Sequence, residues 1–191
     1  MKKSIALVMM AVLLVAASVM GTLAYLTSHD KVVNTFTVGK VAITLDEADV
    51  DVYGAPIENA ARVRANEYKL IPGHAYTKNP TVHFAAGSEA SWLFVKVENG
   101  IANIEADKKI ADQIIDNDWT ALTGVTGVYY KKVDANNTAA AIDYPVFETF
   151  KLDGEADVSK YANAAVKVTA YAIQADGFAN ADAAWAKLAT N

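Results

Sequence analysis

The stretch WLFVKVENG, residues 92–100, decides the fold class of this chain. Its first four positions are all apolar, whereas Lys96 and Glu98 alternate with Val97. The first half therefore predicts a strand buried on both faces, and the second half a strand with one solvated face. The Asn-Gly pair at the end is a strong turn signal, so the strand is expected to stop there.

Shorter stretches of the same character recur along the chain. Val41, Ile43 and Leu45 alternate with less apolar neighbours, which is the period-two pattern of a half-buried strand. Further strands are predicted at Phe36–Val38, Tyr68–Ile71, Thr81–Phe84, Val128–Tyr130, Pro145–Phe150 and Val166–Ile173. About eight short strands separated by turns favour a mainly β protein, built as an antiparallel sandwich.

One or two short helices are expected to lie on this sandwich. Isoleucines at helical spacing predict an amphipathic helix from Ile104 to Ile115, with acidic and basic residues between them. Asn180 is a suitable N-cap for a second helix, in which Trp185 and Leu188 share one face. We expect Trp185 to pack against the body of the protein.

The N-terminus has the pattern of a secretory signal peptide. Two lysines precede an apolar run at residues 5–20, which is shorter than the roughly 20 residues that span a bilayer. Thr22 and Ala24 fit the small-residue positions −3 and −1 of a signal-peptidase site, so cleavage is expected between Ala24 and Tyr25. The alternative is a retained membrane anchor, because a tilted helix extended past Tyr25 could cross a bilayer. In both cases the rest of the chain faces the outside of the cell.

Three segments follow from these patterns. Residues 1–24 are the signal peptide, residues 25–38 an N-terminal strand segment, and residues 39–191 a single β-sandwich domain. Within that domain, linkers are predicted at residues 46–67 and 134–143, which are acidic or polar.

Composition excludes several classes of protein. With 53% hydrophobic and 20% charged residues, the chain is not globally disordered. It has 17 basic and 22 acidic residues and no basic run longer than a pair, so nucleic acid is not an expected partner. The absence of cysteine excludes a disulfide miniprotein, a zinc finger and a cysteine-nucleophile enzyme.

Three blocks of the chain resemble the TasA/camelysin family, which is exported through a SipW-type signal peptidase. They are TFTVGKVAITLDE at 35–47, YKLIPGH at 68–74 leading to NPTV at 79–82, and VTAYAIQADGF at 168–178. The resemblance implies a jelly-roll-like sandwich that serves as a fibre subunit of the extracellular biofilm matrix of Gram-positive bacteria. It also implies self-association, or association with related matrix proteins, at the cell surface or in the matrix. Membrane contact would then occur only through the uncleaved signal.

The segment Tyr25–Val38 is a candidate donor strand for such assembly. An open sheet edge offers unpaired backbone groups, and an incoming extended segment can satisfy them while its side chains fill apolar pockets. The residues expected to make these contacts are Tyr25, Leu26, Val32, Val33 and Phe36. The alternative is that Val32–Phe36 forms the first strand of its own domain and the protein stays monomeric.

Some members of that family are described as metallopeptidases, so the histidines need inspection. His29, His74 and His83 are the only ones, and none belongs to a His-Glu-x-x-His pair that could bind zinc from one helix face. We therefore predict no catalytic residue, no cofactor and no metal ligand, and expect the protein not to be an enzyme. A metal-dependent peptidase is kept as an alternative.

Two other clusters suggest ligands, although a simpler role explains each. An acidic cluster could supply oxygen ligands to calcium, but it lacks the glycine and glutamate of an EF-hand and is better explained as a solvated loop. Its members are Asp46, Glu47, Asp49 and Asp51. An aromatic set could stack on sugars in a cell-surface glycan-binding module, but core packing accounts for it equally well. Its members are Trp92, Tyr129, Tyr130 and Tyr171.

Overall fold

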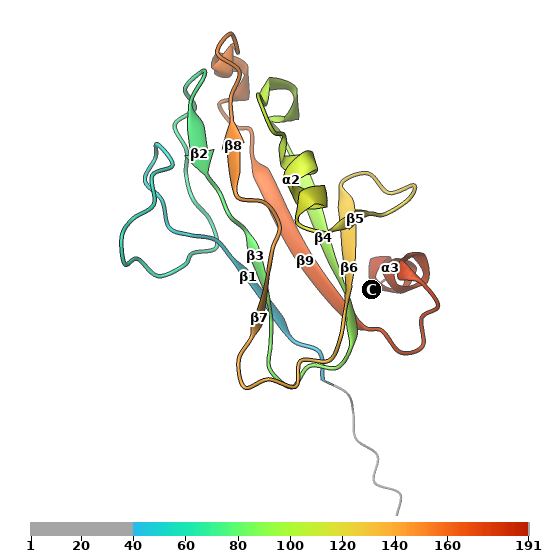
Figure 1. The fold of residues 1–191 in the computed structure, drawn as a ribbon. Helices are drawn as coiled ribbons and strands as arrows, with labels where there is room; N and C mark the ends of the chain where they lie inside the picture. Colours follow the sequence, from blue (N-terminus) through green and yellow to red (C-terminus); the bar gives the residue numbers. More distant parts are fainter. Residues whose placement is uncertain (1–39, 191) are drawn as a thin grey trace, which may run out of the picture. The chain divides into compact units, whose positions relative to one another are not determined.

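The computed structural model describes residues 40–190, which fall within one compact unit of the chain (Figure 1). The signal peptide, the strand segment Tyr25–Val38 and the predicted strand at Phe36–Val38 lie outside the described residues. The strands are β1 (Ile43–Asp46), β2 (Ala75–Thr77), β3 (Thr81–Phe84), β4 (Ser91–Asn99), β5 (Thr120–Ala121), β6 (Val128–Val133), β7 (Ile142–Pro145), β8 (Thr149–Lys151) and β9 (Val166–Gln174).

These strands form antiparallel sheets, which confirms the predicted fold class. A four-stranded sheet has the order β5-β6-β4-β9, a three-stranded sheet the order β1-β3-β7, and β2 pairs with β8 in a ribbon. Every one of these pairings is antiparallel. The finer expectation of a jelly-roll-like topology stays a prediction.

Strand β4 is the centre of the four-stranded sheet. It pairs with β6 on one side and along its full length with β9 on the other. Its residues from Ser91 to Val95 are all buried, whereas Lys96 is half-buried and Glu98 exposed. This is the change from two buried faces to one that the stretch 92–100 predicts.

Two apolar clusters cover the two faces of β4. Leu93, Val95 and Val97 belong to a large cluster that also holds residues of β3, β8 and the helix α2 (Ile110–Asp116). Trp92 and Phe94 belong to a smaller cluster on the opposite face, closed by the helix α3 (Ala181–Ala189). The protein therefore has two layers of core with one sheet between them.

Helix α3 follows the prediction closely. The Asn180 side chain accepts a hydrogen bond of 2.9 Å from the Ala183 backbone N–H, as an N-cap does. The Trp185 ring lies 5.3 Å from Phe94 and 5.5 Å from Tyr171, between ring centroids. Among residues 40–190, no helix is long and apolar enough to cross a bilayer.

The predicted helix Ile104–Ile115 is only half correct. A short 3-10 helix covers Ala102–Ile104, and α2 begins at Ile110. Asp107 between them has a φ of 55°, and the Glu105 carboxylate accepts a hydrogen bond from the Ile110 N–H. The Glu105 carboxylate thereby accepts from a backbone N–H in the first turn of α2, which has no acceptor within the helix. This hydrogen bond favours a break in the predicted helix before Ile110. Ile115, which the helical spacing assigns to the packed face, is 48% exposed.

Two predicted strands are also wrong. Residues 68–71 form no strand, because the Tyr76 hydroxyl donates to the Lys69 carbonyl and accepts from the Ile71 N–H in place of a neighbouring strand. The stretch Pro145–Phe150 is divided between the end of β7 and the start of β8, since Val146 and Phe147 turn into the core and are fully buried. A sequence pattern shows that a stretch is apolar. It does not show whether the backbone N–H and C=O groups of that stretch bond to a neighbouring strand or to a side chain such as Tyr76.

Candidate functional site: a groove along strand β9

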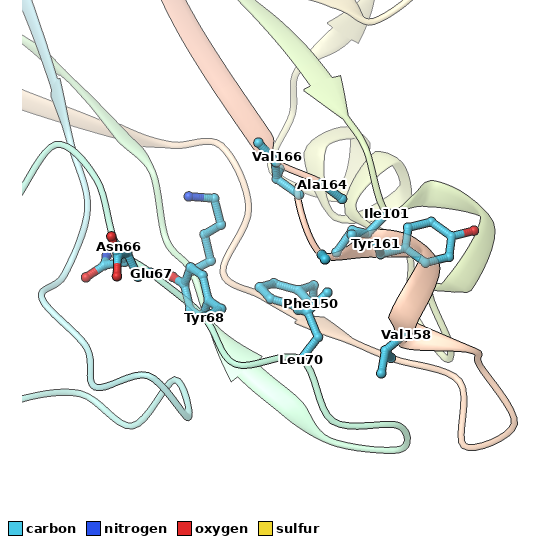
Figure 2. Close-up of a pocket in the computed structure, with 13 residues that line it drawn as sticks. Asn66, Glu67, Tyr68, Leu70, Ile101, Phe150, Val158, Tyr161, Ala164 and Val166 are labelled. Atoms are coloured by element: carbon cyan, nitrogen blue, oxygen red, sulfur yellow. The ribbon is translucent and has the colours of Figure 1, made fainter.

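A pronounced hollow lies beside the start of β9. Two adjoining cavities, of about 550 Å³ and about 480 Å³, share Asn66, Lys78, Ala165 and Val166 in their walls. We call the two together the β9 groove. In Figure 2, Tyr68, Leu70 and Phe150 lie across the first cavity from Ile101 and Ala164. The second cavity continues between β9 and the end of β1 and is lined by Leu45, Asp46, Glu47, Val166, Lys167 and Val168, among others.

One edge of β9 has no partner among the described strands. The Ala175 N–H donates to the Ala90 carbonyl (2.7 Å), and the Gly100 N–H donates to the Ala165 carbonyl (2.9 Å). The backbone groups of residues 165 and 175 therefore point towards the chain of β4. Because backbone groups alternate in an antiparallel strand, the odd-numbered residues of β9 face β4. The even-numbered residues direct their N–H and C=O groups to the open edge. They are Val166, Val168, Ala170, Ala172 and Gln174.

The four apolar side chains of this set, Val166, Val168, Ala170 and Ala172, pack against the large core cluster but leave it incompletely covered. They are only partly buried. Their neighbours on β4, by contrast, are between 0% and 8% exposed: Leu93, Val95 and Val97. The apolar core is therefore less well covered at β9 than at β4. At this edge, backbone N–H and C=O groups and apolar side chains are both available to bind another extended segment.

A buried polar cluster lies in the wall between the two cavities. Lys78 Nζ lies 2.6 Å from Glu47 Oε2, and Asn66 Nδ2 donates to Glu47 Oε1 at 3.0 Å. The Lys78 and Glu47 side chains are only 10% and 5% exposed. Burial, together with the nearby charge of Glu47, raises the pKa of the Tyr68 hydroxyl far above its usual range. The expectation that Glu47 belongs to a solvated loop is wrong, because this carboxylate has protein partners on both oxygens.

The other acidic residues of that loop have different partners. Asp46 contacts Arg62 and His83, and Asp51 accepts hydrogen bonds from the backbone N–H groups of its own turn at Tyr53 and Ala55. Asp46, Glu47 and Asp51 therefore each have their own set of partners. Within residues 40–190, no three His, Cys, Asp or Glu side chains are grouped as a metal site requires.

The histidines are separated as well. His29 lies outside the described residues, and the His74 Nε2 atom is 2.8 Å from the Tyr53 carbonyl. His83, on the middle strand of its sheet, lies between two carboxylates: its Nε2 is 2.8 Å from Asp46 and its Nδ1 is 2.6 Å from Asp143. It therefore joins β1 and β7 through β3.

The charge of His83 should make this sheet sensitive to pH. Burial opposes protonation, but the hydrogen bonds and charges of Asp46 and Asp143 raise the pKa of His83 above its ordinary value. Because the pKa of His83 is higher in the folded than in the unfolded protein, protonated His83 stabilises the fold. This stabilisation is complete at a pH below the pKa of the unfolded chain, and it is lost as the pH rises through the pKa of the folded protein. We expect the difference in free energy of unfolding between wild type and His83→Gln to shrink from about pH 5 to about pH 9, measured by urea titration. Asp143→Asn should weaken this dependence, and a difference that grows with pH would contradict the assignment.

The aromatic set does not form one platform. Trp92 is buried, and its ring packs edge-on against Tyr130 with centroids 5.8 Å apart. Tyr130 and Tyr171 pack against the smaller cluster under α3, whereas Tyr129 packs against the large cluster on the other face. Core packing therefore accounts for the positions of these residues.

Comparison with family models, with curated proteins and with solved structures found no match for this chain. The resemblance to the TasA/camelysin family therefore rests on the three sequence blocks alone. The predicted cleavage site at Ala24 and Tyr25 lies outside the described residues, as do the strand residues Leu26, Val32, Val33 and Phe36.

Proposed function

We propose that this protein is an exported structural protein of the extracellular matrix that forms fibres by strand addition along the open edge of β9. The proposal rests on two features that occur together on β9. Its outward backbone groups have no described partner, and its inward side chains are incompletely covered. A single extended segment would correct both deficits at once.

The occupant we propose is the segment Tyr25–Val38 of a second copy. It has the length for a strand beside the nine-residue β9. Val32 and Phe36 fall on one face of an extended chain, and the small side chains of Ala170 and Ala172 leave room on the inner face of β9. Removal of the signal peptide would free this segment, so that export controls assembly. The jelly-roll-like topology belongs to this proposal as well.

Cleavage after Ala24 is the first expectation. Small residues at −3 and −1 fit the peptidase, so N-terminal sequencing of exported protein should begin at Tyr25. Intact chain recovered only from membranes would show that the segment is a retained anchor.

Assembly should depend on a free N-terminal segment. Three purified forms are compared by sedimentation at equal concentration: one starting at Tyr25, one with a folded tag before Tyr25, and one starting at Thr35. Only the first should form long polymers. A tagged form that polymerises equally well, or a first form that stays monodisperse across pH and salt, would contradict the proposal.

The β9 edge can be tested separately with proline. The Ala170 N–H faces the open edge, so Ala170→Pro should remove a donor needed by the incoming strand and keep every bond to β4. The matched variant Thr169→Pro loses an N–H that faces β4 and should melt at a lower temperature. Ala170→Pro should therefore be folded but unable to polymerise.

A mixture makes the test sharper. Ala170→Pro keeps its N-terminal segment and can donate a strand, whereas the form starting at Thr35 keeps β9 and can accept one. Each should be monomeric alone, and together they should form heterodimers and nothing larger. A mixture that stays monomeric, or Ala170→Pro alone forming polymers, would exclude β9 as the acceptor.

A further inference from the structure

We propose that Lys78 and Asn66 become joined by an intramolecular amide bond between Lys78 Nζ and Asn66 Cγ, with Glu47 as the proton carrier. The proposal is independent of fibre assembly, because all three residues belong to one chain. It concerns the buried polar cluster in the wall of the β9 groove, which the proposed strand addition does not use.

One carboxylate brings the two reacting groups together. Glu47 Oε2 lies 2.6 Å from Lys78 Nζ, and Glu47 Oε1 accepts a hydrogen bond of 3.0 Å from Asn66 Nδ2. The nucleophile and the leaving group are thus held by adjacent oxygens of the same side chain. Such positioning replaces a bimolecular encounter and is the largest requirement for a slow acyl transfer.

The Asn66 amide is also oriented and polarised. Its Oδ1 accepts a hydrogen bond of 3.1 Å from the Val50 N–H, and its Nδ2 donates to the Ala48 carbonyl at 2.9 Å as well as to Glu47. The Val50 N–H points at the oxygen on which negative charge develops when Cγ is attacked.

A proton acceptor lies next to the Lys78 amine. The Lys78 and Glu47 side chains are only 10% and 5% exposed, Glu47 Oε2 lies 2.6 Å from Lys78 Nζ, and Nζ lies 5.9 Å from the centre of the Tyr68 ring. In the proposed step Lys78 gives a proton to Glu47 across this contact and attacks as an uncharged amine.

The reaction balances without any further reagent. Lys78 Nζ transfers a proton to Glu47 and attacks Asn66 Cγ, which forms the new C–N bond and places the negative charge on Oδ1. The Cγ–Nδ2 bond breaks as Nδ2 takes the proton from Glu47 and leaves as ammonia, and the second proton on Nζ then passes through Glu47 to that ammonia. The products are one amide cross-link, one ammonium ion and Glu47 as the carboxylate it was at the start, so the protein is lighter by one ammonia.

Intact mass spectrometry of the purified, folded protein tests the proposal. The mass should be lower than that of the sequence by one ammonia molecule, and proteolysis should give a branched peptide that joins residues 66 and 78. Asn99-Gly100 could also lose ammonia by forming a succinimide, so the branched peptide must be located by fragmentation. A full mass, or a loss located only at Asn99, would overturn the proposal.

Variants separate the roles of the three residues. Lys78→Arg keeps a charge for Glu47 but removes the reactive amine, and Glu47→Gln keeps the shape but removes the proton carrier. Both should have the full mass. Lys167→Arg, which changes another lysine of the same cavity, should lose ammonia as wild type does. Loss of ammonia and a branched peptide in Glu47→Gln would show that Glu47 is not the proton carrier, and the same in Lys78→Arg would exclude Lys78 as the nucleophile.

Discussion

Replacing Phe94 with alanine is expected to lower the free energy of unfolding by about 3–5 kcal/mol. Phe94 is fully buried in the smaller core cluster, and its ring lies 5.3 Å from Trp185 and 6.3 Å from Tyr130. Removing it would leave a cavity between β4 and α3 and withdraw one of the two aromatic rings that pack against Trp185. A loss of this size is a large share of the stability of an ordinary domain, which is about 5–15 kcal/mol.

Urea unfolding of the mature protein measures this loss. Glu98→Ala, on an exposed position of the same strand, should change the free energy of unfolding far less than Phe94→Ala does. Melting temperatures with and without EDTA should agree, since we expect the stability to rest on the aromatic core. A fall of more than several degrees on chelation, or equal effects of the two substitutions, would contradict this expectation.

The second large effect is expected at Asn136, which is completely buried in the loop between β6 and β7. Its Nδ2 donates to the carbonyls of Phe84 and Ala140, and its Oδ1 accepts from the backbone N–H and the hydroxyl of Thr138. Asn136→Ala would remove the buried partner of the Phe84 carbonyl and the bonds that hold Thr138 and Ala140, at a cost of about 1–3 kcal/mol. Asn137→Ala provides the control in the same urea titration, because that side chain is exposed. Equal losses would show that the loop gains little from Asn136.

The long elements of the fold could be predicted from sequence because their signals are local. The apolar run of β4, the alternation of β9 and the Asn180 cap of α3 each lie within one element. The wrong predictions lie where a side chain distant in sequence makes hydrogen bonds to the backbone. Tyr76 replaces a strand partner for residues 68–71, and Gln113 accepts from the N–H groups of Glu148 and Thr149 at the start of β8. No periodicity carries that information.

The candidate site could not be predicted, since its parts are brought together only by the fold. Glu47 follows β1, Asn66 lies in a loop and Lys78 follows β2, and each looks like an ordinary surface residue in the sequence. The open edge of β9 could not be predicted either. The alternation of residues in a strand shows which face is apolar, but it does not show which edge of the strand lacks a neighbouring strand. The blocks that suggested matrix assembly gave a hypothesis about the N-terminal segment but no acceptor for it.

The central place of β4 also has a consequence for how the protein is made. Its partner β9 comes late in the chain, after β5, β6, β7 and β8. A chain that grows or emerges from its N-terminus therefore holds its most apolar strand with one side unpaired until residues 166–174 exist. Pairing between such distant segments closes a long loop and is slow. During that interval β4 is the segment most exposed to aggregation, so a chaperone that protects the nascent chain should bind near residues 92–97 and be released when β9 docks.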